Sequence, residues 1–275
     1  MIPVGNPQFV LEQREAVKSG HGTLVMNFYV NKDVLGRWIA SGDLFHEKIG
    51  DTAFFFRRDD DFFHLFYVSP THDELGRGLM SLSGRPEILV PDVVTKTEEE
   101  VSVLRLFRSN GFHHYSTLVR MCVAGNLGGG ANGVSDDVAF GSVGDVDRIR
   151  DVLTANFDCY AERIPSTAEI AADVADKKFL LIEKHGQIVG LVHYELIGLT
   201  SHLRRWFVDP GFRGLNIGSK LLHRYFSLSG KAARFILWVL RPNMNAIERY
   251  RHYGYREDGL VDTIFVNREG MCHGG

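Results

Sequence analysis

The stretch VDPGFRGLNIGSKLL, residues 208–222, constrains the fold of this 275-residue chain more than any other feature. A strand that ends at Val208-Asp209-Pro210 stops pairing there, because proline has no N–H to donate and fixes its own φ. An apolar helical pattern follows at residues 219–229. The first N–H groups of a helix lack partners within it, and with the positive end of the helix dipole they attract anions. We therefore predict a strand, a tight loop and a helix whose N-terminus binds a phosphate or pyrophosphate.

The loop between this strand and helix has the residue types that suit phosphate oxygens. Arg213 adds a full charge and a forked set of donors, and small or turn-tolerant residues at 214, 216 and 218 allow the backbone to approach a ligand. A Walker loop is excluded because the order here is Gly218-Ser219-Lys220, and the spacing and position of a dinucleotide fingerprint are also absent. The predicted phosphate-binding residues are Arg213, Gly214, Leu215, Asn216, Ile217, Gly218 and Ser219.

A second motif lies about 30 residues further along. Its members are Asn243, Ala246, Tyr250, Gly254 and Tyr255, which follow the pattern N-x-x-A-x-x-x-Y-x-x-x-G-[F/Y]. Together the two motifs resemble the GNAT superfamily of N-acetyltransferases, whose pyrophosphate loop reads [Q/R]-x-x-G-x-[G/A] after a strand ending in V-x-P. The middle glycine is replaced here by Asn216, the residue that after glycine best tolerates a positive φ.

The resemblance covers residues 138–267 and implies a cofactor, a reaction and several roles. It implies that acetyl-CoA binds across the splayed ends of two central strands, with its pantetheine arm pairing to backbone near Trp206, Phe207 and Val208. Asn243 would bind that arm, and Tyr250 would protonate the departing thiolate. The chain is thus expected to be an acyltransferase that moves an acetyl group to a primary amine of a small molecule or peptide. Packing with its helical neighbours is the alternative role for Tyr250.

The base that takes the amine proton is left open by the sequence. The family often places a glutamate five residues before the asparagine, and this chain has Trp238 there. His193, Glu195 and His202 are the candidates on neighbouring segments. The missing glutamate and Asn216 together motivate an alternative function, a noncatalytic acyl-CoA-binding or sensing protein.

The order of patterns after residue 137 is β-α-α-β-β-β-α-β-α-β, with a capping pair at Ser166 and Glu169 and a hairpin turn at His185-Gly186. This order is also the family's. We predict an α/β (α+β) fold, a mixed and mostly antiparallel sheet flanked by helices.

The sequence pattern of the first part of the chain resembles a degenerate repeat of the second part. Two strands end at Val68-Ser69-Pro70, and a helical pattern ends at Gly111-Phe112, at a spacing close to that of the second copy. Phe107 stands in place of the tyrosine and Asp73 in place of Arg213. We therefore expect two tandem copies, a degenerate domain at 1–124 and a catalytic domain at 138–275, joined by a glycine-rich linker at 125–137. An unrelated α/β domain at 1–124 is the alternative.

Composition and charge limit the classes of molecule that this chain is expected to bind. The net charge is −3 without a dense basic run, so we expect no nucleic acid, and no apolar run approaches the ~18 residues of a membrane span. The N-terminus lacks the pattern of a signal peptide, which favours a cytoplasmic location. The cysteines, Cys122, Cys159 and Cys272, have neither disulfide-framework nor metal-ligand spacing, so we expect reduced thiols and no metal. Whether the chain forms a homodimer is left open.

Overall fold

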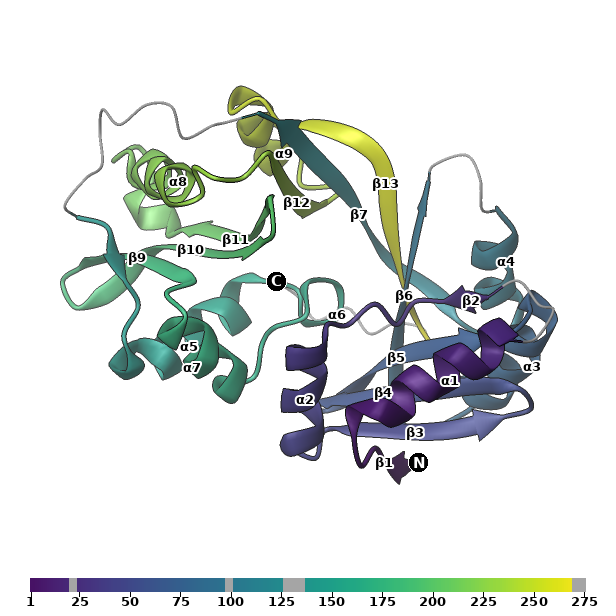
Figure 1. Cartoon of the computed structure of the whole chain (residues 1–275). Helices are drawn as coiled ribbons and strands as arrows, with labels where there is room; N and C mark the ends of the chain where they lie inside the picture. Colours follow the sequence, from purple (N-terminus) through teal and green to yellow (C-terminus); the bar gives the residue numbers. More distant parts are fainter. Residues whose placement is uncertain (20–23, 97–100, 126–136, 269–275) are drawn as a thin grey trace. The chain divides into compact units, whose positions relative to one another are not determined.

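The structure is a computed structural model that describes residues 1–19, 24–96, 101–125 and 137–268. These residues form two compact units (Figure 1). Unit 1 contains Met1–Thr117 and the chain from Leu260 onward, and unit 2 contains Leu118–Gly259. Of the expected linker at 125–137, all but its two end residues lies outside the described residues.

Unit 1 is built on a sheet in the order β1-β3-β4-β5-β6-β13, in which only the β5–β6 pair is parallel. A short strand, β2, pairs with β5 off this path. Its elements are β1 (Ile2–Pro3), α1 (Pro7–Ser19), β2 (Val25–Met26), α2 (Lys32–Ala40), β3 (Leu44–Ile49), β4 (Thr52–Asp59), β5 (Phe62–Ser69), α3 (His72–Ser83), β6 (Ile88–Lys96), α4 (Val101–Ser109) and the start of β7 (His113–Ala124).

Both faces of the unit 1 sheet are covered, as the continuous apolar run FFF in β4 requires. Phe54 and Phe56 pack in one cluster with the helices α3 and α4, whereas Phe55 packs in another with α1 and α2. The split follows from the period of 2 in a strand, which sends successive side chains to opposite faces.

Unit 2 repeats this plan with a sheet in the order β7-β12-β11-β10-β9-β8, again with one parallel pair, β11–β12. Its elements are β8 (Ala139–Phe140), η1 (Val143–Asp145), α5 (Val146–Asn156), α6 (Cys159–Glu162), α7 (Thr167–Ala175), β9 (Phe179–Lys184), β10 (Gln187–Ile197), β11 (Thr200–Val208), η2 (Pro210–Phe212), α8 (Ile217–Leu228), β12 (Arg234–Leu240), α9 (Met244–His252) and β13 (Arg256–Val266). The predicted mixed sheet flanked by helices is confirmed.

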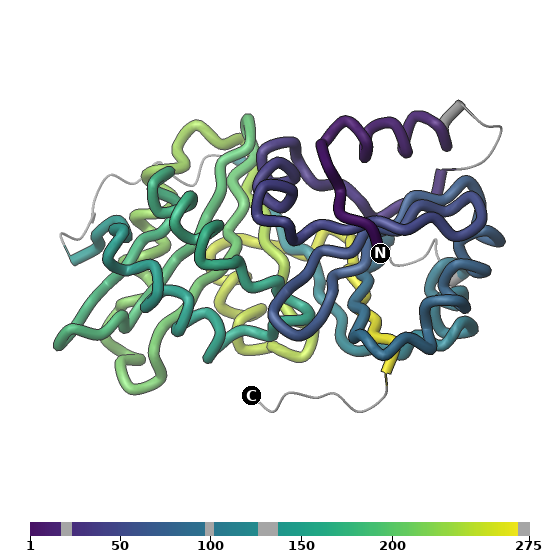
Figure 2. The backbone as a smooth tube through the Cα atoms, turned by 90° about the horizontal axis from the view of Figure 1, so that it is seen from below, coloured from purple at the N-terminus to yellow at the C-terminus, as the bar shows by residue number. Residues whose placement is uncertain are grey.

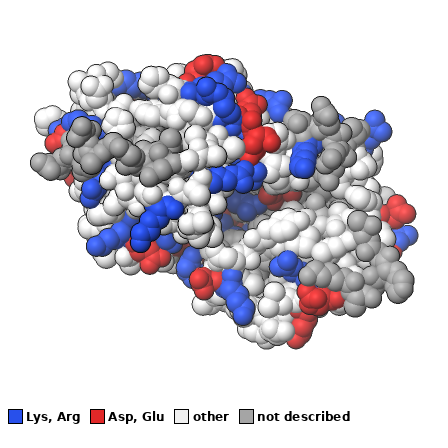
Figure 3. All heavy atoms as spheres, turned by 45° about the horizontal axis from the view of Figure 1, so that its top comes forward, with Lys and Arg blue, Asp and Glu red and all other residues white. Residues whose placement is uncertain are grey.

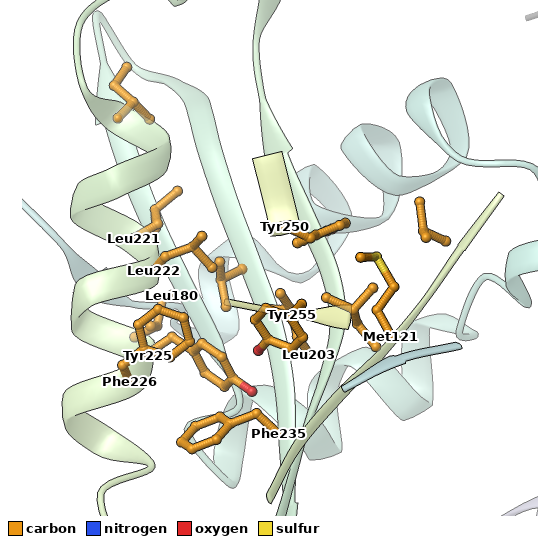
Figure 4. Packing of buried hydrophobic residues seen from close by; sticks show 14 of the residues in the cluster. Met121, Leu180, Leu203, Leu221, Leu222, Tyr225, Phe226, Phe235, Tyr250 and Tyr255 are labelled. Carbon is orange, nitrogen blue, oxygen red and sulfur yellow. The ribbon is translucent and has the colours of Figure 1, made fainter. Parts of the chain in front are cut away.

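The core of unit 2 also divides between the two faces of its sheet. Leu180 packs with Leu221 and Tyr225 of α8, as Figure 4 shows, and Phe179 packs with α5 and α7 on the other face. Two local predictions are confirmed here. Ser166 and Glu169 form a reciprocal capping box at the start of α7, and the β9–β10 turn has positive φ at His185 and Gly186.

The last strand of each unit comes from the other half of the chain. Residues 118–124 of β7, which follows α4 of unit 1, pair with β12 of unit 2. Residues 260–264 of β13, which follows α9 of unit 2, pair with β6 of unit 1, and Figure 2 shows this yellow strand beside the blue strands of unit 1. The expected domains at 1–124 and 138–275 differ from these units, because a local sequence pattern marks a strand without specifying its pairing partner.

The longer helices and the strands of the two units follow the same order, although unit 2 has in addition the short helices η1 and η2. Between the first two helices, unit 1 has the strand β2 and unit 2 has the short helix α6. Charged residues of both signs are interspersed on the face drawn in Figure 3. Among the described helices, none is long and apolar enough to cross a bilayer.

Candidate active site

The strands β11 and β12 pair over a short distance and then separate. Their parallel register runs from Thr200↔Arg234 to Leu203↔Leu237, yet β11 continues to Val208 and β12 to Leu240. The separation begins at a β-bulge, because Tyr194 of β10 pairs with Leu203 and His193 pairs with Arg205, which leaves Arg204 as an extra residue. An extra residue bends the strand that carries it, so the bulge accounts for the divergence.

A pocket of about 310 Å³ opens where the two strands have separated. Both strand ends contribute to it, together with the start of α9, the end of α5 and the segment around α6. The residues that line it are Asn156, Phe157, Asp158, Glu162, Arg204, Arg205, Trp206, Phe207, Val208, Pro210, Arg213, Trp238, Val239, Leu240, Asn243, Asn245, Ala246, Arg249 and Tyr250.

The predicted phosphate loop lies beside this pocket and has the expected backbone shape. Asn216 has φ 58° and ψ 15°, so it takes the left-handed conformation for which the family's glycine is suited. The first intrahelical bond of α8 runs from the Lys220 N–H to the Asn216 carbonyl, at 3.0 Å. Among the described residues no side chain caps this helix, so its first N–H groups remain available to an anion.

Gly218 sets how closely α8 approaches β11. A Cβ atom at this position would lie 2.8 Å from Cζ2 of Trp206, so only glycine allows the helix to lie this close to the indole ring. The indole Nε1 is buried and has no hydrogen-bond partner among the described residues. Trp206 also lines the pocket.

Tyr250 belongs both to the core and to the pocket. Its side chain is 8% exposed and packs in the apolar cluster of unit 2 (Figure 4). Its ring centroid is 5.5 Å from that of Trp206. It also lines the pocket. Burial raises the pKa of its hydroxyl, and the negative charge of Glu162 raises it further. Tyr250 is therefore a protonated O–H donor at neutral pH.

The second motif has a structural reason for its spacing. Asn243 is the N-cap of α9, and its Oδ1 accepts a 3.1 Å hydrogen bond from the Ala246 N–H. This bond holds the side chain of Asn243 at the rim of the pocket, where Ala246 also lies. The N-x-x-A spacing is thus the spacing of an N-cap residue and its bonded N–H.

None of the three candidate bases lines the pocket. His193 is stacked on Phe179, and its ring nitrogens contact Asp173 at 3.0 Å and Arg205 at 3.1 Å. Burial lowers the pKa of His193 to about 4 against the opposing effect of Asp173. Burial likewise lowers the pKa of His202 well below its usual value, and Glu195 forms a 2.6 Å ion pair with Arg204.

Glu162 is the pocket carboxylate that the sequence analysis did not single out. It lies at the end of α6, and its Oε2 accepts a 3.0 Å hydrogen bond from the Asp158 N–H. Burial raises the pKa of its carboxyl, although the Asp158 bond and the charge of Arg205 act in the opposite direction. One sequence signal could have revealed this segment. Asp158 and Glu162, four residues apart and before the second predicted helix, are residue types that cap a helix N-terminus.

The part of the chain that the structure describes contains no cluster of three or more His, Cys, Asp or Glu side chains that could hold a metal ion. Neither Cys122 nor Cys159 forms a disulfide among the described residues, and Cys272 lies outside them.

Comparison with known families relates this geometry to a known class of protein. Residues 146–255, all within unit 2, match the acetyltransferase (GNAT) family. Unit 2 is a GNAT domain. The match includes the separated strands, the phosphate loop and the helix with Tyr250, and both motifs noted in the sequence lie inside it.

Individual proteins agree with this assignment. An uncharacterized N-acetyltransferase of Methanocaldococcus jannaschii is 33% identical over 92 residues, which cover 30% of this chain and 41% of that protein. The chain thus matches less than half of the length of that relative.

Solved structures extend the likeness to both units. A tandem GNAT protein from the clavulanic acid biosynthesis pathway superposes with a TM-score of 0.62 at 10% identity, over 96% of this chain and 97% of its own. A GCN5-related N-acetyltransferase from Sphaerobacter thermophilus gives 0.57 at 16% identity, over 80% and 78%. At such identities the likeness concerns the fold, which is that of a tandem GNAT protein.

Proposed function

We propose that unit 2 transfers an acetyl group from acetyl-CoA to a primary amine of a small molecule or peptide. The observation that carries the proposal is the pocket between the separated ends of β11 and β12, because Arg213 of the loop before α8 and the buried Tyr250 both line it. An extended ligand with a phosphate at one end and a reactive thioester at the other fits this arrangement.

The residues of unit 2 suit each part of acetyl-CoA. Arg213 and the N–H groups that follow Asn216 would bind the pyrophosphate. The backbone of Trp206–Val208, on the side of β11 that β12 has left, would pair with the amide groups of the pantetheine arm. The amide group of Asn243 would donate to the same arm.

In the reaction the acyl thioester supplies an activated carbonyl carbon. The amine nitrogen attacks this carbon, and backbone N–H groups at the end of β11 would stabilise the oxyanion that develops. The C–S bond then breaks, and the Tyr250 hydroxyl gives its proton to the sulfur. A buried phenol with a raised pKa keeps that proton until the thiolate needs it.

One observation keeps a second function in view, namely binding or sensing of acyl-CoA without catalysis. Trp238 lines the pocket at the position where the family often has a glutamate, and its ring lies 5.8 Å from the Arg120 guanidinium. Under this alternative, acetyl-CoA binds and no amine releases its thiol.

The test is calorimetric titration with acetyl-CoA, followed by thiol release in a panel of primary amines. Arg213→Glu reverses the charge at the loop and should weaken binding at least 100-fold. Lys231→Glu makes the same charge change at an exposed site beyond the other end of α8, and it should bind like the wild type. Thiol release by the wild type supports transfer, binding without release supports the sensor, and no binding rejects both.

A further inference from the structure

We infer that Glu162 is the base that takes the proton of the attacking amine, an inference that rests on the proposed function. Two acidic residues, Asp158 and Glu162, line the pocket. Asp158 Oδ1 is committed to the cap of α6, because it accepts from the N–H groups of Tyr160 and Ala161 at 2.9 Å each. Glu162 Oε2 accepts from the Asp158 N–H, and its Oε1, which has no hydrogen-bond partner among the described residues, can accept a proton.

The position of Glu162 is fixed by the segment that carries it. The bond between the Asp158 N–H and Glu162 Oε2 closes α6 on itself, and the Arg205 guanidinium bonds the carbonyls of Glu162 and Arg163 at 2.5 and 2.6 Å. The Arg205 bonds fix the backbone of Glu162 and the Asp158 bond fixes one oxygen of its carboxylate, so the side chain loses little freedom when the amine arrives. Glu162 and Tyr250 both line the pocket, so the two groups face the same space.

The surroundings of Glu162 keep it basic. Burial favours its neutral form, which makes the carboxylate a better proton acceptor than an exposed one. The charged and titratable groups around it are Asp158 and Arg163 on its own segment, Arg204 and Arg205 on β11, His193 bonded to Arg205, and Arg249 and Tyr250 on α9.

Glu162 and Tyr250 together account for the two proton transfers that the reaction requires. As the C–N bond forms and the C–S bond breaks, Glu162 takes one proton from the amine nitrogen and Tyr250 gives one to the sulfur. Transfer of the proton from Glu162 to the Tyr250 phenolate, directly or through water, restores both groups. No oxidant or further reactant is required.

The test is Glu162→Gln, which keeps an oxygen to accept from the Asp158 N–H. We expect unchanged affinity for acetyl-CoA, a kcat at neutral pH at least 100-fold lower, and recovery as rising pH deprotonates the amine itself. Glu162→Asp should restore part of the rate, and Glu248→Gln, an exposed site on α9, should match the wild type. A Glu162→Gln variant with the wild-type pH profile overturns Glu162 alone, whereas a wild type that releases no thiol overturns the transferase as well.

A different observation carries a second inference, on unit 1. Its strands β5 and β6 pair in parallel from Phe62↔Ile88 to Leu65↔Pro91, which is the same four-pair register that β11 and β12 have in unit 2. Beyond that point β2 pairs with β5 instead, through Met26↔Val68 and Val25↔Ser69. The place that is a pocket in unit 2 is therefore occupied in unit 1 by the chain itself.

Asn27 bridges the two separated strands. Its Oδ1 accepts from the Tyr67 N–H at 2.8 Å, and its Nδ2 donates to the Leu65 carbonyl at 3.1 Å and the Asp92 carbonyl at 3.0 Å, with a further contact to Asp92 Oδ1. The side chain is 9% exposed. One amide thus satisfies backbone groups on both strands, which is what the amide groups of a pantetheine arm would do.

We propose that residues 25–27 are a built-in occupant of the cofactor cleft in unit 1, so that each chain binds one acyl-CoA. The rest of unit 1 agrees with this assignment. Thr71 caps α3 by accepting from the Glu74 N–H, and Asp73 and Glu74 lie in its first turn, where negative charge repels a phosphate. Phe107, at the place of Tyr250, is fully buried against Phe265.

The stoichiometry of acetyl-CoA in calorimetry tests this proposal. We expect one site per chain and no residual site in Arg213→Glu, whereas two sites, or one that survives this variant, would overturn it. Asn27→Asp keeps the acceptor and replaces the donor, so it should lower the unfolding midpoint by several degrees and leave acetyl-CoA affinity unchanged. Asn31→Asp is the matched control, because Asn31 accepts only as the cap of α2. Equal midpoints for the two variants would also overturn the proposal.

Discussion

The connection between the first two helices differs between the units, although the strands around it diverge in the same way. In unit 1 this connection, with Val25, Met26 and Asn27, runs along β5 and bridges to β6. In unit 2 it folds into α6, which Asp158 caps, and it lines a pocket instead of filling it. Whether this fold offers a cleft therefore depends on the path of about ten residues rather than on its sheet.

Each unit also treats the start of its third long helix differently. Unit 1 satisfies the first turn of α3 with the Thr71 hydroxyl and acidic side chains. Unit 2 begins α8 with the left-handed Asn216 and without a side-chain cap among the described residues. The same helix end is closed to anions in one unit and open in the other.

The largest expected effect concerns the tyrosine that unit 1 has lost. Tyr250→Phe should lower kcat by roughly 10²- to 10⁴-fold, which is the usual contribution of a general acid, and leave acetyl-CoA affinity nearly unchanged. The ring packing with Trp206 is retained, so stability should change little. Steady-state kinetics and calorimetry measure the two quantities, and an unchanged kcat would reduce Tyr250 to the packing role that Phe107 has in unit 1.

Acid should destabilise unit 2 through its buried histidine. The pKa of His193 is about 4 in the fold against 6.5 as the ordinary value, because burial disfavours its charge. As the pH falls, His193 is protonated in the unfolded chain before it is protonated in the folded one. The free energy of unfolding is therefore unaffected by His193 above pH 6.5, and it falls by about 3 kcal/mol between pH 6.5 and about pH 4. His202 acts in the same direction.

Thermal unfolding between pH 7.5 and pH 4.5 measures this loss. His193→Gln removes the titrating group, so its midpoint should depend less on pH across that window than the wild-type midpoint does. Equal slopes for the two proteins would assign the acid sensitivity to other groups.

A glycine in α3 of unit 1 and another in α8 of unit 2 allow the two helices to be compared by substitution. A Cβ at Gly218 would lie 2.8 Å from the Trp206 ring, and a Cβ at Gly78 of α3 would lie 2.4 Å from the Phe54 ring. Each alanine variant should lose about 1–3 kcal/mol of stability through overpacking. Only Gly218→Ala should also weaken acetyl-CoA binding, and an equal loss of affinity in Gly78→Ala would contradict the assignment of the cofactor to unit 2.

The smallest effect is expected at the two helix starts themselves. Asn216→Ala should cost about 1 kcal/mol, because alanine is strained at a φ of 58°, and Asn216→Gly should be nearly neutral. Thr71→Ala should cost a similar ~1 kcal/mol for a different reason, the loss of its bond to the Glu74 N–H. Denaturant unfolding measures all three, and a destabilised Asn216→Gly would mean that the asparagine side chain itself has a role.

The sequence predicted correctly those features of the fold that depend on residues close together in the chain. The turn before α8 with its left-handed Asn216, the capping box at Ser166 and the mixed sheet follow from residues close together in the chain. The exchange of β7 and β13, the occupant at Asn27 and the pocket position of Glu162 depend on pairings between distant segments, which periodicity does not encode. For the same reason the bases proposed on β10 and β11 are directed away from the pocket by burial and ion pairing.

The exchanged strands have a consequence for biosynthesis. Unit 1 pairs β6 with residues 260–264, which leave the ribosome after every element of unit 2 has been made. The edge of β6, which ends at Lys96, must therefore stay unpaired while the roughly 160 residues before Leu260 are translated, and an unpaired edge is an opportunity for aggregation. A stop codon placed between the two units would release a nascent sheet of unit 1 that lacks its closing strand and exposes the edge of β6 to other chains.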